Sequence, residues 1–538
     1  MKHTLRLLTF CFALCLILAA GIAAVSRVTA PHAPVYDLVI TNARVVDGTG
    51  TPAFRADVAI KAGRIARIGR IDVRDARESI DAHNQVLAPG FIDVHTHVES
   101  IFNQPSAENF ARMGVTTLVT GNCGYSAYDV KEFFDHFKQN PISVNLATLI
   151  AHGTVRGRVL GLENRAPSPE ELLKMESLVE KGMKDGAVGL STGLIYVPGT
   201  YAKTDEVVAL ARVAARYGGL YATHMRDEGA GVVAAIRESL NIGAEAKIPV
   251  EISHFKITSK KLWGQSTVTL GLVRDARARG QAVTVDEYAY TASSTSLDVL
   301  LPDWVLEGGR DAGTQRLEDD ATRERVVREM LENLKRGGFQ DYSYAVVASY
   351  APDASFNGKS ITEITRQQRG TNDLRAQIEQ VLEMYAAGGA GMVYHKMSEE
   401  DVERIMREPF TMIASDSGVH TLGEGVPHPR GYGNNARVLG RYVRERHLMT
   451  LEEAVRKMTS LPAQTFKLRE RGIIREGYAA DLVLFDDARI ADQATYDRPH
   501  QYPTGIDRVI VNGETILANG QMTKARPGTA LRGPGATN

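Results

Sequence analysis

The feature that most constrains this 538-residue chain is the alternation, through its middle part, of short apolar runs with amphipathic helical stretches. This alternation is typical of a parallel α/β fold, because each buried strand is followed by a helix that covers the sheet. Eight runs stand out, at residues 86–94, 116–120, 144–150, 187–191, 220–223, 250–253, 282–286 and 411–415. We therefore predict an α/β fold with a (β/α)₈ TIM-like barrel over residues 89–465.

The gap between the seventh and eighth runs is much too long for one crossover, so we expect an insertion at about residues 293–395. A charged helical stretch at residues 322–334 lies within it. The active site of such a barrel is expected at the carboxyl ends of the strands. The helix would suit a lid over that site.

Strand-rich segments lie at both ends of the chain. A β-branched run begins at Tyr36, and a hairpin pattern turns at Lys61-Ala-Gly. Similar strand and hairpin patterns follow Ala480 and Arg508. We predict one small β-domain built from both termini, with residues 36–88 as its N-terminal part and residues 466–530 as its C-terminal part.

The first 30 residues have the pattern of a targeting segment. Basic residues precede an apolar run from Leu7 to Val25, and the small residues at positions 28 and 30 would suit a signal peptidase cut after Ala30. The run is also nearly long enough to span a bilayer. Residues 1–30 are therefore either a cleaved signal peptide or a retained membrane anchor. Both alternatives predict an exported protein, periplasmic or membrane-anchored, that faces away from the cytoplasm.

Charge and cysteine content narrow the function. The formal net charge of −1 gives no support for nucleic-acid binding, which usually shows as a basic excess, and no pattern indicates a protein partner. Cys11 and Cys15 lie in the leader, so a cleaved protein keeps only Cys123. A free thiol in an oxidising compartment needs protection, and ligation of a metal would supply it.

Polar residues of the types that bind metals follow five of the predicted strands. They are His95, His97, Cys123, His224, His254 and Asp416. Each alone has a structural explanation, since histidines can be satisfied core residues and a buried cysteine packs well. Six such residues at five strand ends are hard to explain by packing. The residues in His95-Thr96-His97 are two apart, so an extended backbone would turn both rings to one side.

The residue types favour zinc. Cys123, His224 and His254 would give three protein ligands with one position open for water, which is the pattern of a catalytic zinc site. His95, His97 and Asp416 would line an adjacent position that could bind a second, weaker metal, bridged through the Cys123 sulfur. Asp416 is our candidate for the general base that takes the proton of the attacking water and delivers it to the leaving nitrogen. Its alternative role, a plain metal ligand, is compatible with this one.

These stretches resemble the amidohydrolase superfamily and, within it, the N-acyl-D-amino-acid deacylases (D-aminoacylases). The matching stretches are Gly90-Phe-Ile-Asp-Val-His-Thr-His, Gly121-Asn-Cys-Gly, Ser191-Thr-Gly-Leu-Ile-Tyr-Val-Pro-Gly, Tyr221-Ala-Thr-His-Met-Arg-Asp-Glu and His428-Pro-Arg-Gly. The resemblance covers about residues 36–525. It implies the same tight zinc site, the same weaker second site and a catalytic role for Asp416.

The resemblance also implies a substrate-binding set. Arg430 and a tyrosine of residues 286–290, with Tyr288 the first choice, would clamp the substrate carboxylate, and Tyr196 would line the acyl or amide side. Two features depart from the family pattern. One is the export leader; the other is Tyr288-Ala-Tyr where Tyr-Pro-Tyr is expected, which leaves the choice between these two tyrosines open.

The predicted function is zinc-dependent hydrolysis of a small-molecule N-acyl-D-amino acid to a carboxylate and a free D-amino acid. One alternative is a dipeptidase acting on D-residue or isoaspartyl peptides. Another is a cyclic amidase such as a hydantoinase or dihydroorotase, although these usually carry a carboxylated lysine at the end of strand four, where this chain has Gly189-Leu-Ser-Thr. A non-catalytic, membrane-tethered binding protein is disfavoured because all six metal-type residues are present.

Overall fold

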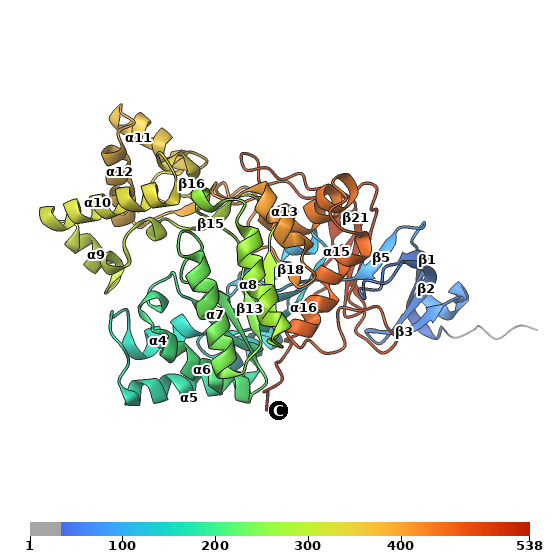
Figure 1. Cartoon of the computed structure of the whole chain (residues 1–538). Helices are drawn as coiled ribbons and strands as arrows, with labels where there is room; N and C mark the ends of the chain where they lie inside the picture. The colour runs from blue at the N-terminus through green and yellow to red at the C-terminus, as the bar shows by residue number, and fades with distance from the viewer. Residues whose placement is uncertain (1–33, 538) are drawn as a thin grey trace, which may run out of the picture.

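The computed structural model describes residues 34–537, and it places a small β-domain on one side of a central barrel and the inserted segment on the other (Figure 1). The signal peptide or anchor expected at residues 1–30 lies outside the described residues. Within residues 34–537, no helix is both long and apolar enough to cross a membrane.

The predicted (β/α)₈ barrel is confirmed. Neighbouring barrel strands pair in parallel, and each of the eight predicted runs contributes a strand. The strands are β6 (Phe91–Asp93), β8 (Val115–Thr120), β9 (Asn145–Thr148) with β10 (Ile150–Ala151), β11 (Gly189–Gly193), β12 (Leu220–His224), β13 (Val250–Ile252), β14 (Val283–Glu287) and β18 (Thr411–Ile413).

The run at residues 86–94 divides between two sheets. Its first part is β5 (Val86–Pro89), which belongs to the small β-domain, and its second part is the barrel strand β6. Gly90 lies at the break, where an added Cβ would come within 2.2 Å of a Thr116 side-chain atom. Only glycine fits this close approach of two strands. The chain therefore requires a glycine where it passes from the small β-domain into the barrel.

The barrel closes between its first and last strands through the segments that carry candidate site residues. β7 (Thr96–His97) pairs in parallel with β19 (Ser417–Gly418). The backbone N–H of Asp416 donates to the carbonyl of His95 at 2.9 Å. The closure therefore brings residues more than 300 positions apart in sequence into direct contact.

Helices cover the outside of the barrel. They are α2 (Glu108–Ala111), α3 (Val130–Gln139), α4 (His152–Leu160), α5 (Pro169–Asp185), α6 (Thr204–Arg216), α7 (Val232–Ala246), α8 (Ser266–Ala278), α13 (Glu399–Arg407), α14 (Arg430–Arg437), α15 (Leu451–Met458) and α16 (Ser460–Thr465). Helix α5 shows why the sequence signals were readable: Ser168 and Glu171 form a capping box, Pro169 occupies the first turn, and Gly186 ends the helix in the left-handed conformation.

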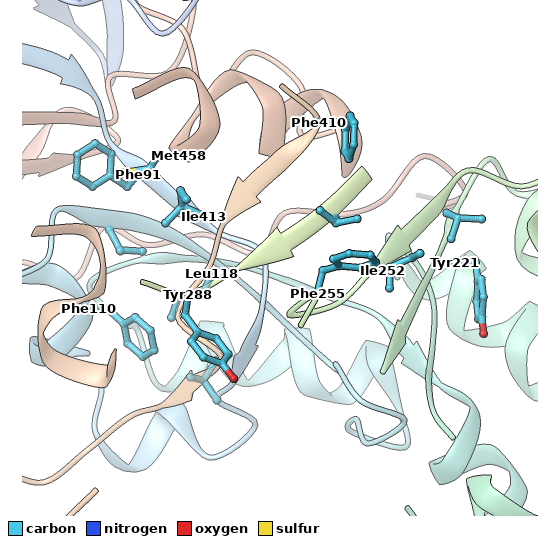
Figure 2. Packing of buried hydrophobic residues seen from close by; sticks show 14 of the residues in the cluster. Phe91, Phe110, Leu118, Tyr221, Ile252, Phe255, Tyr288, Phe410, Ile413 and Met458 are labelled. Carbon is cyan, nitrogen blue, oxygen red and sulfur yellow. The ribbon is translucent and has the colours of Figure 1, made fainter. Parts of the chain in front are cut away.

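Alternate residues of the barrel strands face opposite sides. Phe91, Leu118 and Ile413 belong to the core between the strands and the helices, as Figure 2 shows. Their neighbours Ile92, Val119 and Met412 belong to a separate buried cluster, inside the barrel. Because both faces of each strand are buried, the strands read as apolar runs rather than as alternating patterns.

The small β-domain is a nine-stranded sheet to which both ends of the chain contribute. The N-terminal strand β5 pairs antiparallel with the C-terminal strand β20, and β1 lies on its other side. The strands are β1 (Tyr36–Val45), β2 (Phe54–Lys61), β3 (Arg64–Gly69), β4 (Ala76–Asp81), β5, β20 (Leu482–Phe485), β21 (Ile506–Val511), β22 (Glu514–Ala518) and β23 (Gln521–Met522).

The inserted segment has a core of its own. It contains a three-stranded antiparallel sheet and four α-helices: β15 (Ser293–Ser296), α9 (Arg310–Arg316), α10 (Asp320–Gly337), β16 (Ala345–Ser349), α11 (Ile361–Arg369), α12 (Leu374–Ala386) and β17 (Gly391–Tyr394). The charged stretch forms α10 as expected, but the sheet, not α10, borders the large cavity at the barrel mouth.

Candidate metal centre

The structure brings all six metal-type residues to the carboxyl end of the barrel. His224 is the last residue of β12, His254 follows β13 by two residues, and Cys123 follows β8 by three. Asp416 follows β18 by three residues, and His95 and His97 follow β6. The prediction of their common location rested on strand ends alone, and the geometry agrees with it.

Three of these residues have left-handed backbones. The φ angles of Cys123, His254 and Asp416 are +52°, +35° and +52°. Residues other than glycine adopt this region rarely, and such strained positions cluster at functional sites, where the surroundings hold them in place. Each left-handed residue follows the end of its strand by two or three residues, and the ligand atoms of these residues gather with those of the histidines at the barrel mouth.

The first cluster is formed by Cys123, His224 and His254. Cys123 Sγ lies 3.6 Å from His224 Nδ1 and 3.5 Å from His254 Nε2. In a tetrahedral site with Zn–S near 2.3 Å and Zn–N near 2.1 Å, sulfur and nitrogen ligands are separated by about 3.6 Å. The ligand atoms therefore have the chemistry and the spacing that a zinc ion requires.

The second cluster adjoins the first. His97 Nε2 lies 3.2 Å from Asp416 Oδ1, and His95 Nε2 lies 3.6 Å from the same oxygen. His95 Nε2 is also 3.2 Å from Cys123 Sγ, and the ligand atoms of His95, His254 and Asp416 lie within 4.8 Å of one another. Cys123 thus contacts residues of both clusters, and its sulfur would be available to a second cation as well as to the first.

The electrostatics favour an ionised cysteine. Burial opposes the thiolate, but His95, His224 and His254 around the sulfur outweigh it and hold the pKa of Cys123 well below its usual range. Burial likewise opposes charge on His97, yet its contacts with Asp416 and Cys123 raise its pKa to about 10. The cluster therefore holds a thiolate among donors, the form of cysteine that binds metals.

Asp416 is also held in its ionised form. Burial alone would raise its pKa, but the nearby charges of Arg430 and His254 and the hydrogen bond from His97 hold it well below its usual range. Arg430 Nη1 lies 2.8 Å from Asp416 Oδ2. The two carboxylate oxygens therefore face different partners, one the metal-type cluster and the other a guanidinium.

A cavity of about 930 Å³ opens over the clusters. Arg430 and Tyr196 line it, together with the inserted sheet at Ser293–Thr295 and Gly391. The Tyr196 hydroxyl lies 3.0 Å from Thr295 Oγ1, and its ring meets His224 edge-on at 4.8 Å. Tyr196 is thus a direct link between the metal cluster and the insertion.

Tyr288 packs against Arg430 in the interior of the protein. Its ring lies beneath the Arg430 guanidinium at 4.5 Å from the ring centroid, but its hydroxyl donates to Met397 Sδ at 3.5 Å, and the side chain is 1% exposed. Figure 2 shows the ring among the buried core residues. Tyr288 supports Arg430 from below and does not line the cavity.

Two carboxylates of the site have no role in the sequence analysis. Asp286 places Oδ2 3.2 Å from His95 Nδ1 and accepts from the backbone N–H of His254 at 2.9 Å. Glu228 places Oε1 3.0 Å from His254 Nδ1. Glu228 lies in a stretch that carries the family resemblance, and Asp286 begins the stretch expected to supply a substrate-binding tyrosine, but only the positions of the histidine rings reveal what their carboxylates contact.

The model of the amidohydrolase family matches residues 78–517 of this chain, and that of the urease alpha-subunit N-terminal domain matches residues 14–89. A D-aminoacylase from Alcaligenes xylosoxydans xylosoxydans is 35% identical over 520 residues, covering 92% of this chain and 97% of that protein. The N-acyl-D-glutamate deacylase of the same organism is 34% identical over 519 residues, covering 92% and 96%.

The comparison with solved structures agrees with the comparison of sequences. The N-acyl-D-glutamate deacylase from Bordetella bronchiseptica, complexed with zinc and a phosphonate that mimics the tetrahedral intermediate, matches with a TM-score of 0.79 and 34% identity, covering 92% of this chain and 99% of that one. A D-aminoacylase structure also has a TM-score of 0.79 and 34% identity, with coverage of 92% and 100%. A D-hydantoinase, with a TM-score of 0.54 and 16% identity over 92% and 99%, shares the fold.

Proposed function

This chain belongs to the amidohydrolase family and groups with its D-aminoacylases and N-acyl-D-amino-acid deacylases, and we propose the following reaction and site. The enzyme is a metal-dependent hydrolase that cleaves the linear amide bond of an N-acyl-D-amino acid to a carboxylate and a free D-amino acid. The observation that carries this function is the meeting of the Cys123 cluster, Asp416 and Arg430 in one cavity.

The cofactor is zinc. Cys123, His224 and His254 would hold the tight zinc, and His95, His97 and Asp416 would hold a weaker second ion next to the Cys123 sulfur. Zinc held by these residues would supply Lewis-acid chemistry for the amide carbonyl and for a water molecule near neutral pH. His95 lies close to both Cys123 and Asp416, which supports two metal sites that adjoin each other.

Asp416 moves the proton. Its Oδ1 faces the metal clusters, so it is placed to accept a proton from a water molecule there. The same carboxyl group then delivers that proton to the amide nitrogen as the C–N bond breaks. Because Asp416 is held ionised, it is ready to act as a base before the substrate arrives.

Arg430 orients the substrate. Its guanidinium carries five N–H donors in a planar fork that matches a carboxylate, and it is fixed from below by the Tyr288 ring. Binding the α-carboxylate at Arg430 places the N-acyl group toward the clusters. Tyr196 borders the acyl or amide side, and its bond to Thr295 keeps the inserted sheet against this part of the cavity.

We also propose that the enzyme works outside the cytoplasm, because of the leader at residues 1–30. Cell fractionation with an antibody against the chain would test this. Recovery in the periplasm or the membrane fraction is expected, and recovery in the cytosol would rule it out.

The function is tested by following release of free amino acid from matched panels of N-acetyl-D- and N-acetyl-L-amino acids with the zinc-loaded enzyme. Release from D substrates only is expected, and Asp416→Asn should lower kcat by about 10²–10⁴-fold while the zinc of the Cys123 site is retained. Release from D-residue dipeptides or cyclic amides with none from either acetyl panel would replace the deacylase assignment by a peptidase or cyclic amidase.

A further inference from the structure

Glu228 lies four residues after the end of β12, and its buried carboxylate is 6% exposed. Its two oxygens face two different rings. Oε1 lies 3.0 Å from His254 Nδ1, and Oε2 lies 3.8 Å from His224 Nε2. These are the nitrogens that point away from Cys123, since the opposite nitrogen of each ring faces the sulfur.

Metal binding fixes the tautomer of both rings. A histidine that gives one nitrogen lone pair to a metal carries its proton on the other nitrogen, and this N–H needs an acceptor that holds the ring in place. Among the described residues, His224 Nε2 has no hydrogen-bond partner, and the carboxylate of Glu228 is the acidic group it approaches. A single carboxylate is therefore available to both rings of the tight site.

Lys256 completes the arrangement. Its Nζ donates to Glu228 Oε1 at 2.6 Å and to the His254 carbonyl at 2.8 Å. Lys256 Nζ also lies 2.8 Å from His254 Nδ1. When His254 Nδ1 carries its proton, this N–H and the lysine ammonium are both donors and face each other. Glu228 Oε1 is the acceptor that both share, and Lys256 balances the buried negative charge.

We infer that Glu228 is a positioning residue shared by His224 and His254, which sets the tautomer and orientation of both rings for zinc. The inference rests on the zinc site of the proposed function. It assigns Glu228 no contact with the substrate, because the carboxylate acts through the outer nitrogens of the two rings. Its effect should therefore appear in the binding of the metal alone.

The test is the zinc dissociation constant of Glu228→Gln, measured by competition with a chromophoric chelator in the absence of substrate. Glutamine keeps one acceptor oxygen but turns a donor toward one of the two rings. We expect zinc to bind about 10–100-fold more weakly than to the unchanged enzyme. Affinity within threefold of the unchanged enzyme would overturn the inference.

The matched control is Glu206→Gln. Glu206 is a buried carboxylate, 5% exposed, that pairs with His152 at 2.9 Å and with a buried arginine, but His152 is outside the metal clusters. It should lower stability without changing zinc affinity. An equal loss of affinity in this variant would show that the effect of Glu228→Gln is general destabilisation.

A second variant tests whether Lys256, left without its carboxylate partner, causes the loss of zinc affinity. Glu228→Gln combined with Lys256→Gln removes the uncompensated charge, and circular dichroism checks the fold. The double variant should fold and still bind zinc weakly; recovery of the original affinity would mean that Lys256, not the histidine rings, carried the effect. Because no substrate is used, weak zinc binding remains measurable even if the deacylase function fails its own test.

Discussion

Arg430 Nη1 and Asp416 Oδ2 are 2.8 Å apart, so the residue proposed to bind the substrate carboxylate is paired with the residue proposed to move the proton. Both side chains are buried, at 3% and 8% exposure. A substrate carboxylate must therefore share the guanidinium with Asp416. The five donors of arginine allow this, whereas the single ammonium of lysine would serve two carboxylates poorly.

Arg430→Lys should therefore weaken recognition of the α-carboxylate while keeping the positive charge. We expect kcat/KM for an N-acetyl-D-amino acid to fall about 10–100-fold, corresponding to about 1–3 kcal/mol for a charge-assisted hydrogen bond. Kinetics on the acid and on its α-carboxamide measure the effect directly. The preference for the acid should shrink in the variant, and an unchanged preference would remove Arg430 from this role.

Arg437→Lys is the matched control for that measurement. Arg437 lies on the same helix, pairs with Asp492 at 2.9 Å and covers the Tyr290 ring at 4.7 Å from its centroid. It thus repeats the arginine–aspartate–tyrosine arrangement of Arg430 outside the lining of the cavity. Its substitution should leave the preference for the acid unchanged.

Cys123→Ser should remove the tight metal. A serine hydroxyl is a far poorer zinc ligand than a thiolate, and Cys123 contacts both histidines of the cluster. After gel filtration in metal-free buffer, we expect the variant to contain little zinc. Chelation should lower the thermal midpoint of the unchanged enzyme, since zinc at 100 times its dissociation constant stabilises by about 2.7 kcal/mol, and should leave that of Cys123→Ser unmoved.

Tyr196 and Thr295 should be coupled energetically, because their hydroxyls form the 3.0 Å contact between barrel and insertion. Tyr196→Phe keeps the ring against His224, so we expect kcat/KM to fall less than tenfold. In a double-mutant cycle with Thr295→Val, the coupling free energy calculated from kcat/KM should be about 1 kcal/mol. Additive effects of the two substitutions would show that this contact does not tie the sheet to the site.

The strand ends were predictable because each barrel strand is buried on both faces and reads as an apolar run that ends in a polar residue. The site followed from that pattern, since His224, His254 and Cys123 all stand just beyond such runs. A closed barrel was predicted, but the residues of β7 and β19 that pair to close it were not, because this pairing joins residues more than 300 positions apart. Sequence periodicity carries no information on such contacts.

The direction of individual side chains was the second feature that could not be predicted from the sequence. Tyr288 belongs to the stretch expected to bind substrate, but its hydroxyl is directed at Met397 and only its ring reaches Arg430. Glu228 lies in an equally recognisable stretch, yet its stretch does not reveal that its two oxygens face His254 and His224. Motifs located these residues, and only their three-dimensional contacts define what each side chain touches.

His420 should make the stability of the enzyme sensitive to acid. Its Nε2 lies 2.8 Å from Ser417 Oγ, and burial, together with the nearby charges of Arg430 and His500, lowers its pKa to about 4. In the unfolded chain a histidine titrates near pH 6.5. The unfolded state therefore binds the proton more readily, and about 3 kcal/mol of stability should be lost as the pH falls from 6.5 to 4.

Urea unfolding of the metal-free protein at pH 7 and pH 4.5 measures this loss without interference from zinc release. His420→Gln does not titrate, so its free energy of unfolding should fall by about 2–3 kcal/mol less than that of the unchanged protein over the same interval. His447→Asn is the control, because His447 is exposed and asparagine tolerates its φ of +49°. An equal fall in all three proteins would mean that His420 takes up its proton as readily in the folded protein as in the unfolded chain.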